Sequence, residues 1–161
     1  MTSPAVHWYF AYGSNMNPAR VEGRGIRFRR AIAGSLEGFD LHFNKRSSIH
    51  AGMAAANVVR APDGLVEGVL YELSTPDQIK QMDPFEGYPE RYVREVCMLK
   101  TGEGLIRAWV YIATDKWLAE GLRPARWYLE HLLAGKGYLS HCYFESLRQV
   151  VCLPDSEIEP A

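Results

Sequence analysis

The chain has 161 residues, of which 47% are hydrophobic, and this length and apolar content suit one globular core. Its 18 Lys and Arg residues nearly balance its 19 Asp and Glu residues, so the formal net charge is -1. This balance disfavours nucleic acid as a partner, because no bulk positive field would hold the chain to phosphate backbones. An anion site is one explanation for a local cluster of arginines, but a solvated face is the commoner one: Arg20, Arg24, Arg27, Arg29 and Arg30.

Cysteine, histidine and apolar patterns argue against several other classes of protein. The chain has an odd number of cysteines, and they show no CxxC spacing: Cys97, Cys142 and Cys152. This pattern disfavours a disulfide framework and a zinc site. The five histidines lack paired metal spacing and no nucleotide-binding glycine motif is present, so we expect neither a metal nor a cofactor. No apolar run or secretion signal occurs, so we expect a cytoplasmic monomer or homodimer that does not bind membranes.

The first predicted elements are a strand, a turn and a helix. The aromatic and apolar run at residues 7–10 predicts a buried strand that ends at Gly13. Asn17 followed by Pro18 is typical of an N-cap with proline at the first helical position. A short helix should therefore begin directly after the turn.

The next segments predict two pairs of strands. Residues 28–33 and 36–43 are expected to pair, with Gly34 and Ser35 separating them. Residues 52–60 and 65–73 flank Pro62-Asp63-Gly64, a sequence typical of a hairpin turn. We therefore expect an antiparallel arrangement in the first half of the chain.

A helix and a third hairpin follow. Thr75, Pro76 and Gln78 predict a helix start, and the helix is expected to run to about Met82 and to stop at Pro84. Residues 91–100 and 105–113 predict a hairpin around the glycine-containing turn at 101–104.

Helical spacing dominates the rest of the chain, at residues 124–133 and 143–150. Strands grouped before helices predict an α+β fold: a small mixed, largely antiparallel β-barrel with flanking helices. We expect one domain over residues 1–153 and a disordered acidic tail over 154–161.

Two segments place unusual residues at element ends. In Tyr12-Gly13-Ser14-Asn15, the glycine permits a positive φ or close approach of a ligand, and successive N–H groups can bind a carboxylate. An ordinary turn satisfied by Ser14 and Asn15 is the alternative. Glu86 lies between Phe85 and Gly87, where aromatic neighbours can desolvate the carboxyl group and raise its pKa. A solvated loop acid is the alternative there.

Four features together resemble the γ-glutamylcyclotransferase family. They are FAYGSNM at 10–16, the strand pattern through Leu73, MDPFEGYPERYVREV at 82–96 and PARWYLEHLLAGKGY at 124–138. The resemblance spans roughly residues 7–149. It implies a small mixed barrel with helices outside and an enzyme that cyclises a γ-glutamyl compound to 5-oxoproline, releasing a free amino acid or amine.

The resemblance also implies roles for individual residues. Tyr12, Gly13, Ser14 and Asn15 would hold the α-carboxylate of the glutamyl group, and Tyr9, Phe10 and Ala11 would line its approach. Glu86 matches the catalytic glutamate. Tyr128 matches a tyrosine that closes the pocket, although its spacing from Pro124 leaves Arg126 or Trp127 as alternatives.

The resemblance leaves the substrate and one other reading open. The donor is a γ-glutamyl amino acid, a γ-glutamyl amine or a γ-glutamyl-protected intermediate, and Asn15 argues against glutathione. No motif identifies the residues that contact the amine side of the substrate. The candidates are His42, Asn44, Arg46 and Trp109. The alternative function is a non-catalytic protein that binds a small carboxylate or mediates interactions on the same scaffold.

Overall fold

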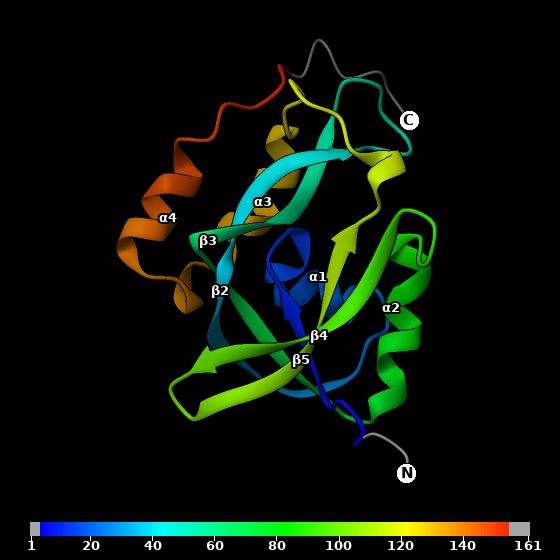
Figure 1. Ribbon diagram of the computed structural model, residues 1–161, viewed down its shortest axis with the longest axis vertical. Coiled ribbons are helices and arrows are strands. Elements are labelled where there is room, and N and C mark those ends of the chain that lie inside the picture. The colour runs from blue at the N-terminus through cyan, green and yellow to red at the C-terminus, as the bar shows by residue number, and fades with distance from the viewer. Residues whose placement is uncertain (1–3, 155–161) are drawn as a thin grey trace.

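The protein, for which a computed structural model describes residues 4–154, is built on a closed five-stranded barrel with strand order β1-β3-β2-β4-β5 (Figure 1). All paired strands are antiparallel except β1 and β5, which run parallel at Tyr9 and Trp109. The predicted α+β class and largely antiparallel barrel are therefore confirmed. The strand bounds are β1 (Trp8–Ala11), β2 (Phe28–Arg46), β3 (Ala54–Leu73), β4 (Tyr92–Thr101) and β5 (Gly104–Ala113).

Within the described residues, four helices lie outside the barrel: α1 (Pro18–Gly23), α2 (Ile79–Glu86), α3 (Arg126–Leu133) and α4 (His141–Arg148). Figure 1 shows α2 on one side of the barrel and α3 with α4 on the other. The predicted cap of α1 is present, because Asn17 Oδ1 accepts a hydrogen bond from the Ala19 N–H at 3.2 Å. No helix within residues 4–154 is long and apolar enough to cross a membrane. The predicted tail lies outside the described residues, except for Pro154.

The two strands expected at 28–33 and 36–43 are one continuous strand, so that prediction is wrong. Gly34 and Ser35 pair with Gly68 and Glu67 of β3 instead of forming a turn. A Cβ atom on Gly34 would lie 2.5 Å from Leu70 Cδ1. This glycine therefore serves close packing inside the barrel wall, which sequence alone does not distinguish from a turn.

The predicted hairpin turn at Pro62-Asp63-Gly64 is also wrong, because β3 continues through it. Pairing with β2 passes from Glu37 opposite Leu65 to Phe39 opposite Arg60, which leaves residues 61–64 as a bulge in β3. A bulge tolerates proline because its residues need not donate to the ladder. Strands β2 and β3 consequently form one long hairpin joined by the loop at 47–53.

Helix α2 does not stop before Pro84 as predicted but continues to Glu86. Proline removes one N–H donor from the helix, and the remaining contacts maintain the last turn. Gly87 follows with φ of 67°, and its N–H reaches the Pro84 carbonyl oxygen at 3.3 Å. This left-handed cap places the Glu86 side chain at the helix end, beside the barrel.

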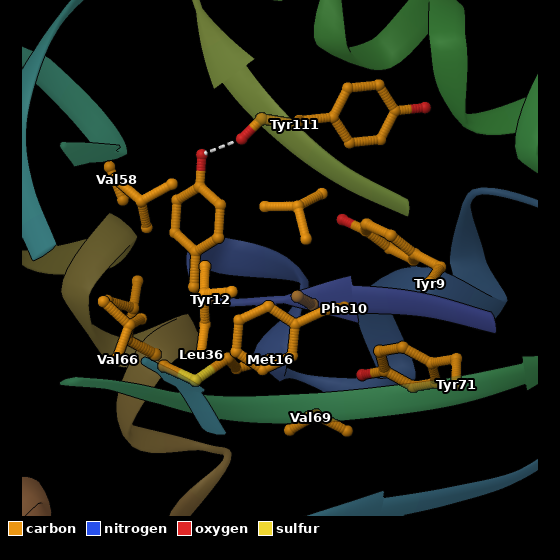
Figure 2. Packing of buried hydrophobic residues seen from close by; sticks show 14 of the residues in the cluster. Tyr9, Phe10, Tyr12, Met16, Leu36, Val58, Val66, Val69, Tyr71 and Tyr111 are labelled. Atoms are coloured by element: carbon orange, nitrogen blue, oxygen red, sulfur yellow. Dashed lines mark hydrogen bonds between the residues drawn. The ribbon is translucent and has the colours of Figure 1, made fainter. Parts of the chain in front are cut away.

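Buried tyrosines fill the part of the barrel interior nearest α2 (Figure 2). The Tyr9 and Tyr71 rings stack at 6.0 Å, and Tyr111 meets Tyr9 edge-on at 5.7 Å. The Tyr12 hydroxyl donates to the Tyr111 carbonyl oxygen at 2.6 Å, the bond drawn in Figure 2. A buried phenol needs such a hydrogen-bond partner, so this bond and the ring contacts fix where the tyrosine rings lie.

Asp83 fastens α2 to the barrel. Arg94 Nε and Nη2 donate to its two carboxylate oxygens at 2.9 and 3.0 Å, and the Tyr111 hydroxyl donates to Oδ1 at 2.7 Å. The side chains of Asp83 and Arg94 are only 14% and 13% exposed. Because both members of this bidentate pair are largely desolvated, removal of Asp83 leaves the nearly buried guanidinium group of Arg94 without its carboxylate partner.

We expect Asp83→Ala to lower the free energy of unfolding by about 3 kcal/mol, because Arg94 loses its carboxylate partner and the Tyr111 hydroxyl loses its hydrogen-bond acceptor. Thermal unfolding followed by circular dichroism measures the loss. Asp77→Ala is the matched control, since the Asp77 side chain is 82% exposed and should change stability by less than about 0.5 kcal/mol. Equal melting temperatures for both variants would contradict this role of Asp83.

Candidate active site

A cavity of about 310 Å³ opens where β1, α2 and α3 meet the β2–β3 hairpin. It brings together eight of the nine site residues predicted from sequence: Tyr9, Phe10, Tyr12, Gly13, Ser14, Asn15, Glu86 and Tyr128. The ninth, Ala11, is buried in β1 opposite Val69 and does not border the cavity. The two motifs singled out in the sequence therefore share one site.

The loop after β1 turns tightly into a short 3-10 helix, η1 (Ser14–Met16). Gly13 has φ of -111°, so the positive φ considered from the sequence is not used. The glycine is required for space instead, because a Cβ atom would lie 3.0 Å from Tyr128 Oη and 3.2 Å from Ala56 Cβ. The loop backbone can consequently approach α3 and the cavity closely.

Asn15 connects the loop to Glu86. Its Nδ2 donates to the Tyr9 hydroxyl at 2.9 Å and to Glu86 Oε1 at 3.2 Å, and it lies 3.3 Å from Met82 Sδ. Its Oδ1 accepts from Arg24 Nη1 at 3.0 Å. Asn15 is only 3% exposed, so these contacts hold its amide in one orientation.

Glu86 is the only carboxylate that borders the cavity within residues 4–154. Burial raises the pKa of its carboxyl group, and Arg24, Lys45, Arg20 and Arg91 partly oppose this shift. Desolvation disfavours the charged form of an acid, whereas nearby cations favour it. The result is a carboxyl group suited to exchanging protons nearer neutral pH than an ordinary glutamate.

Tyr128 lies against the loop, and two backbone amides point at its hydroxyl oxygen. The Ala56 N–H donates to Oη at 2.9 Å, and the Ser14 N–H is the second donor. Burial raises the pKa of Tyr128 to about 12. Because both amides use the oxygen as an acceptor, the hydroxyl proton is available to a ligand in the cavity.

The two alternatives to Tyr128 take different positions. Trp127 also borders the cavity and is partly exposed, with its ring 6.1 Å from that of Tyr128. Arg126 does not border the cavity, and its Nε donates to Glu130 Oε1 at 2.8 Å on the outer face of α3.

Several cations around the cavity are not among the predicted site residues: Arg20, Arg24, Lys45 and Arg91. Arg20 and Arg24 belong to the arginine cluster attributed to solvent, and their spacing of four residues from α1 into its C-cap places both on the cavity side. The other three arginines of that cluster are exposed as expected. The helical period is the signal that distinguishes the two groups.

The residues suggested for the amine side do not border the cavity: His42, Asn44, Arg46 and Trp109. Asn44 is buried, but its Oδ1 accepts from Asn57 Nδ2 at 3.1 Å. Arg46 is exposed and reaches the Lys116 carbonyl oxygen at 2.9 Å. Successive side chains in a strand face opposite ways, so Lys45 rather than its neighbour Arg46 faces the cavity.

Comparison with known proteins assigns this chain to a family. The family model described as γ-glutamyl cyclotransferase, AIG2-like, matches residues 9–129. The chain therefore belongs to this family, as the resemblance in the sequence indicated. No curated protein sequence matches it. The match includes the loop, Glu86 and Tyr128.

Solved structures give the same fold. A γ-glutamyl cyclotransferase is 25% identical with a TM-score of 0.78, over 91% of this chain and 89% of its own. An uncharacterized protein from Homo sapiens is also 25% identical with a TM-score of 0.79, over 93% and 90%. YkqA from Bacillus subtilis shares the fold at 20% identity with a TM-score of 0.77, over 91% of this chain and 55% of its own.

We expect Gly13→Val to weaken binding of 5-oxoproline about tenfold or more, because the added side chain must displace Tyr128 or Ala56. Isothermal titration calorimetry measures the affinity. Gly102→Val is the control, since a Cβ atom there meets nothing within 4 Å. An unchanged affinity of the Gly13 variant would remove this loop from the binding site.

The raised pKa of Glu86 predicts how stability depends on pH. The folded protein holds the Glu86 proton to higher pH than the unfolded chain, so this group reduces stability as pH rises through its folded pKa. Glu86→Gln removes this loss of stability at higher pH, because the amide does not titrate. The melting temperature of the variant relative to the wild type should therefore be higher at pH 8 than at pH 4.

Glu103→Gln provides a control of opposite sign, because Arg30 lowers the pKa of Glu103. That carboxylate contributes stability above its unfolded pKa, and the contribution is lost as pH falls through the folded pKa. The relative melting temperature of this variant should fall from pH 4 to pH 8. If the relative melting temperature of Glu86→Gln falls from pH 4 to pH 8, as that of Glu103→Gln should, the raised pKa of Glu86 is wrong.

Proposed function

We propose that this protein is a γ-glutamylcyclotransferase that converts a γ-glutamyl amino acid or amine into 5-oxoproline and a free amine. The observation that carries the proposal is a single carboxylate with a raised pKa, held by Asn15 within the cavity that the Tyr-Gly-Ser-Asn loop borders. Family membership supports the same reaction. A passive binding site for a carboxylate would have no evident use for this acid.

The proposed pose follows from charge and hydrogen bonding. The α-carboxylate of the glutamyl group would lie against the loop N–H groups of Gly13 and Asn15, since backbone amides bind anions at such turns and the Ser14 N–H is directed at Tyr128. The α-ammonium group would then face Glu86, the only carboxylate among the described residues that border the cavity. The γ-carbonyl oxygen would face the hydroxyl proton of Tyr128.

The first step is proton transfer from the α-ammonium group to Glu86. An α-amino group has an ordinary pKa of about 8, so it is protonated and not nucleophilic at neutral pH. Because the pKa of Glu86 is raised, it lies closer to the pKa of the ammonium group, so proton transfer to Glu86 is easier than transfer to an exposed glutamate. The neutral amine regains its lone pair.

Ring closure follows within one molecule. The amine nitrogen attacks the γ-carbonyl carbon, a C–N bond forms, and the carbonyl electrons move onto the oxygen. Holding both groups in a near-attack geometry removes most of the entropic barrier, and effective molarities in such systems reach about 10⁵ M or more. The Tyr128 hydroxyl is positioned to stabilise the oxyanion because its own oxygen already accepts two amide protons.

Collapse of the tetrahedral intermediate completes the reaction. The oxyanion electrons reform the carbonyl, the bond to the departing nitrogen breaks, and protonated Glu86 donates its proton to that nitrogen. The ring nitrogen still carries two hydrogens after the attack, and it gives one of them to the Glu86 carboxylate, which passes it to the released amine or to water. The lactam and the free amine leave, and Glu86 returns to its carboxylate form. The chain itself forms no covalent bond to the substrate.

We expect Glu86→Gln to lower kcat for 5-oxoproline release by about 100-fold or more, because the amide cannot accept the ammonium proton. Release is measured from γ-glutamyl-alanine, a γ-glutamyl amine and glutathione, with wild type and variant side by side. Glu90→Gln is the matched control, since Glu90 is exposed four residues further along the chain. The Glu86→Gln variant should retain binding of 5-oxoproline.

Full turnover by the Glu86 variant would discard this mechanism. If the wild type binds 5-oxoproline but releases it from none of the donors, the protein is a non-catalytic carboxylate-binding member of the family.

A further inference from the structure

Lys45 is a buried cation that forms no salt bridge with any carboxylate among the described residues. It lies near the end of β2, is 4% exposed, and borders the cavity. Its Nζ lies 5.4 Å from the centre of the Tyr92 ring and 5.0 Å from that of Trp117. Within residues 4–154, no carboxylate oxygen lies within 4.0 Å of it. Burying a charge without an opposite charge is costly, so such a group points to an anion that binds there.

The other cations around the cavity already have polar partners. Arg24 donates to Asn15, Arg20 Nη1 lies 3.4 Å from His131 Nε2, and Arg91 donates to the Ser48 hydroxyl. The Lys45 ammonium group instead lies over aromatic faces. Arg20 Nε is also buried without a hydrogen-bond partner, but Lys45 is the cation whose charged group as a whole has no polar partner among the described residues, so it is the most available to a ligand.

The γ-glutamyl group by itself does not need a further cation. Under the proposed function, its α-carboxylate lies at the loop and its α-ammonium at Glu86, which leaves this part of the substrate neutralised. Among the described residues, four cations surround the cavity against the one carboxylate of Glu86. This excess of positive charge fits a substrate with a second anionic group, and electrostatic complementarity of this kind decides between ligands of similar shape.

We propose that Lys45 binds the carboxylate of the departing amino acid, and so makes γ-glutamyl amino acids the preferred substrates over uncharged γ-glutamyl amines. This inference rests on the proposed function. Lys45 belongs to β2, whereas the loop follows β1, so two walls of one cavity would hold the two ends of the substrate. An uncharged amine would displace water from Lys45 without supplying an anion, which disfavours its binding.

The test compares γ-glutamyl-alanine with γ-glutamylethylamide, which differ by one carboxylate. We expect wild-type kcat/KM to favour γ-glutamyl-alanine by about 10- to 100-fold, the range of a charge-assisted hydrogen bond. Lys45→Met should abolish this preference by lowering kcat/KM for γ-glutamyl-alanine more than for the ethylamide, mainly through KM, because the loss of a positive charge near Glu86 affects both substrates alike. Lys45→Arg should retain most of the preference, because the positive charge remains.

Lys100→Met is the control for the general loss of a positive charge, since Lys100 is exposed on β4 and does not border the cavity. It should retain the wild-type preference. Melting temperatures of all variants show whether each remains folded.

The preference should also depend on pH. Burial first, and then the positive charges of Arg91 and Arg46, lower the pKa of Lys45 to about 8 against the opposing effect of Glu86. The neutral Tyr92 ring faces the same ammonium group. The ratio of kcat/KM values for the two substrates should therefore fall as pH rises through about 8. The protonation of Glu86 and of the substrate amine affects both substrates and cancels in the ratio.

Three results would overturn the inference. Equal kcat/KM of the wild type for both substrates removes the selectivity while the proposed function stands. An equal loss on both substrates in Lys45→Met assigns Lys45 to the shared γ-glutamyl group or to folding. Release of 5-oxoproline from neither substrate removes the proposed function, and this inference with it.

Discussion

The hydrogen bonds of the Asn15 amide are the interaction on which the site depends. Its Nδ2 reaches both Tyr9 and Glu86, its Oδ1 accepts from Arg24, and its backbone oxygen accepts the Tyr71 hydroxyl proton at 2.6 Å. These partners come from β1, the C-cap of α1, α2 and β3. A buried amide must satisfy its donors and acceptor together, so the side chain and backbone oxygen of one residue set the relative positions of four elements around the cavity. An apolar residue of similar volume would pack there without imposing that arrangement.

The charges around the cavity oppose the effect of burial on Glu86. Burial raises the pKa of its carboxyl group, and in the proposed reaction a carboxyl group that is already protonated cannot accept the ammonium proton. Arg24, Lys45, Arg20 and Arg91 oppose that effect. The same cations outnumber the one carboxylate among the described residues that border the cavity, which favours anionic ligands. Under the proposed function, proton exchange and substrate preference are therefore linked through one group of side chains, which come from α1 and its C-cap, from β2 and from the loop before β4.

The depth of the site comes from the long β2–β3 hairpin. Its strands extend beyond the region where the other strands pair, and Lys45 with Ala56 lies in that extension. Ala56 offers its N–H to Tyr128 and its carbonyl oxygen to the Tyr92 hydroxyl at 2.7 Å. Backbone groups of one strand therefore orient two aromatic walls of the cavity, and the glycine at position 13 lets the loop approach them.

The Asn17-Pro18 helix start and the hairpin around 101–104 were readable from the sequence, because residue types there constrain their own backbone over short spacings. The order of strands and helices indicated the α+β class, and the resemblance to the family paired the Tyr-Gly-Ser-Asn loop with Glu86 as the candidate site. Tertiary structure alone decided that Gly34 and Pro62 lie within strands, because a glycine beside Leu70 and a proline in a bulge look like turns until the partner strand is known. The four-residue spacing of Arg20 and Arg24 places both on one face of α1, but tertiary structure decided that this face and Lys45 border the cavity. Burial of a charged side chain depends on elements distant in sequence, and no local pattern encodes their approach.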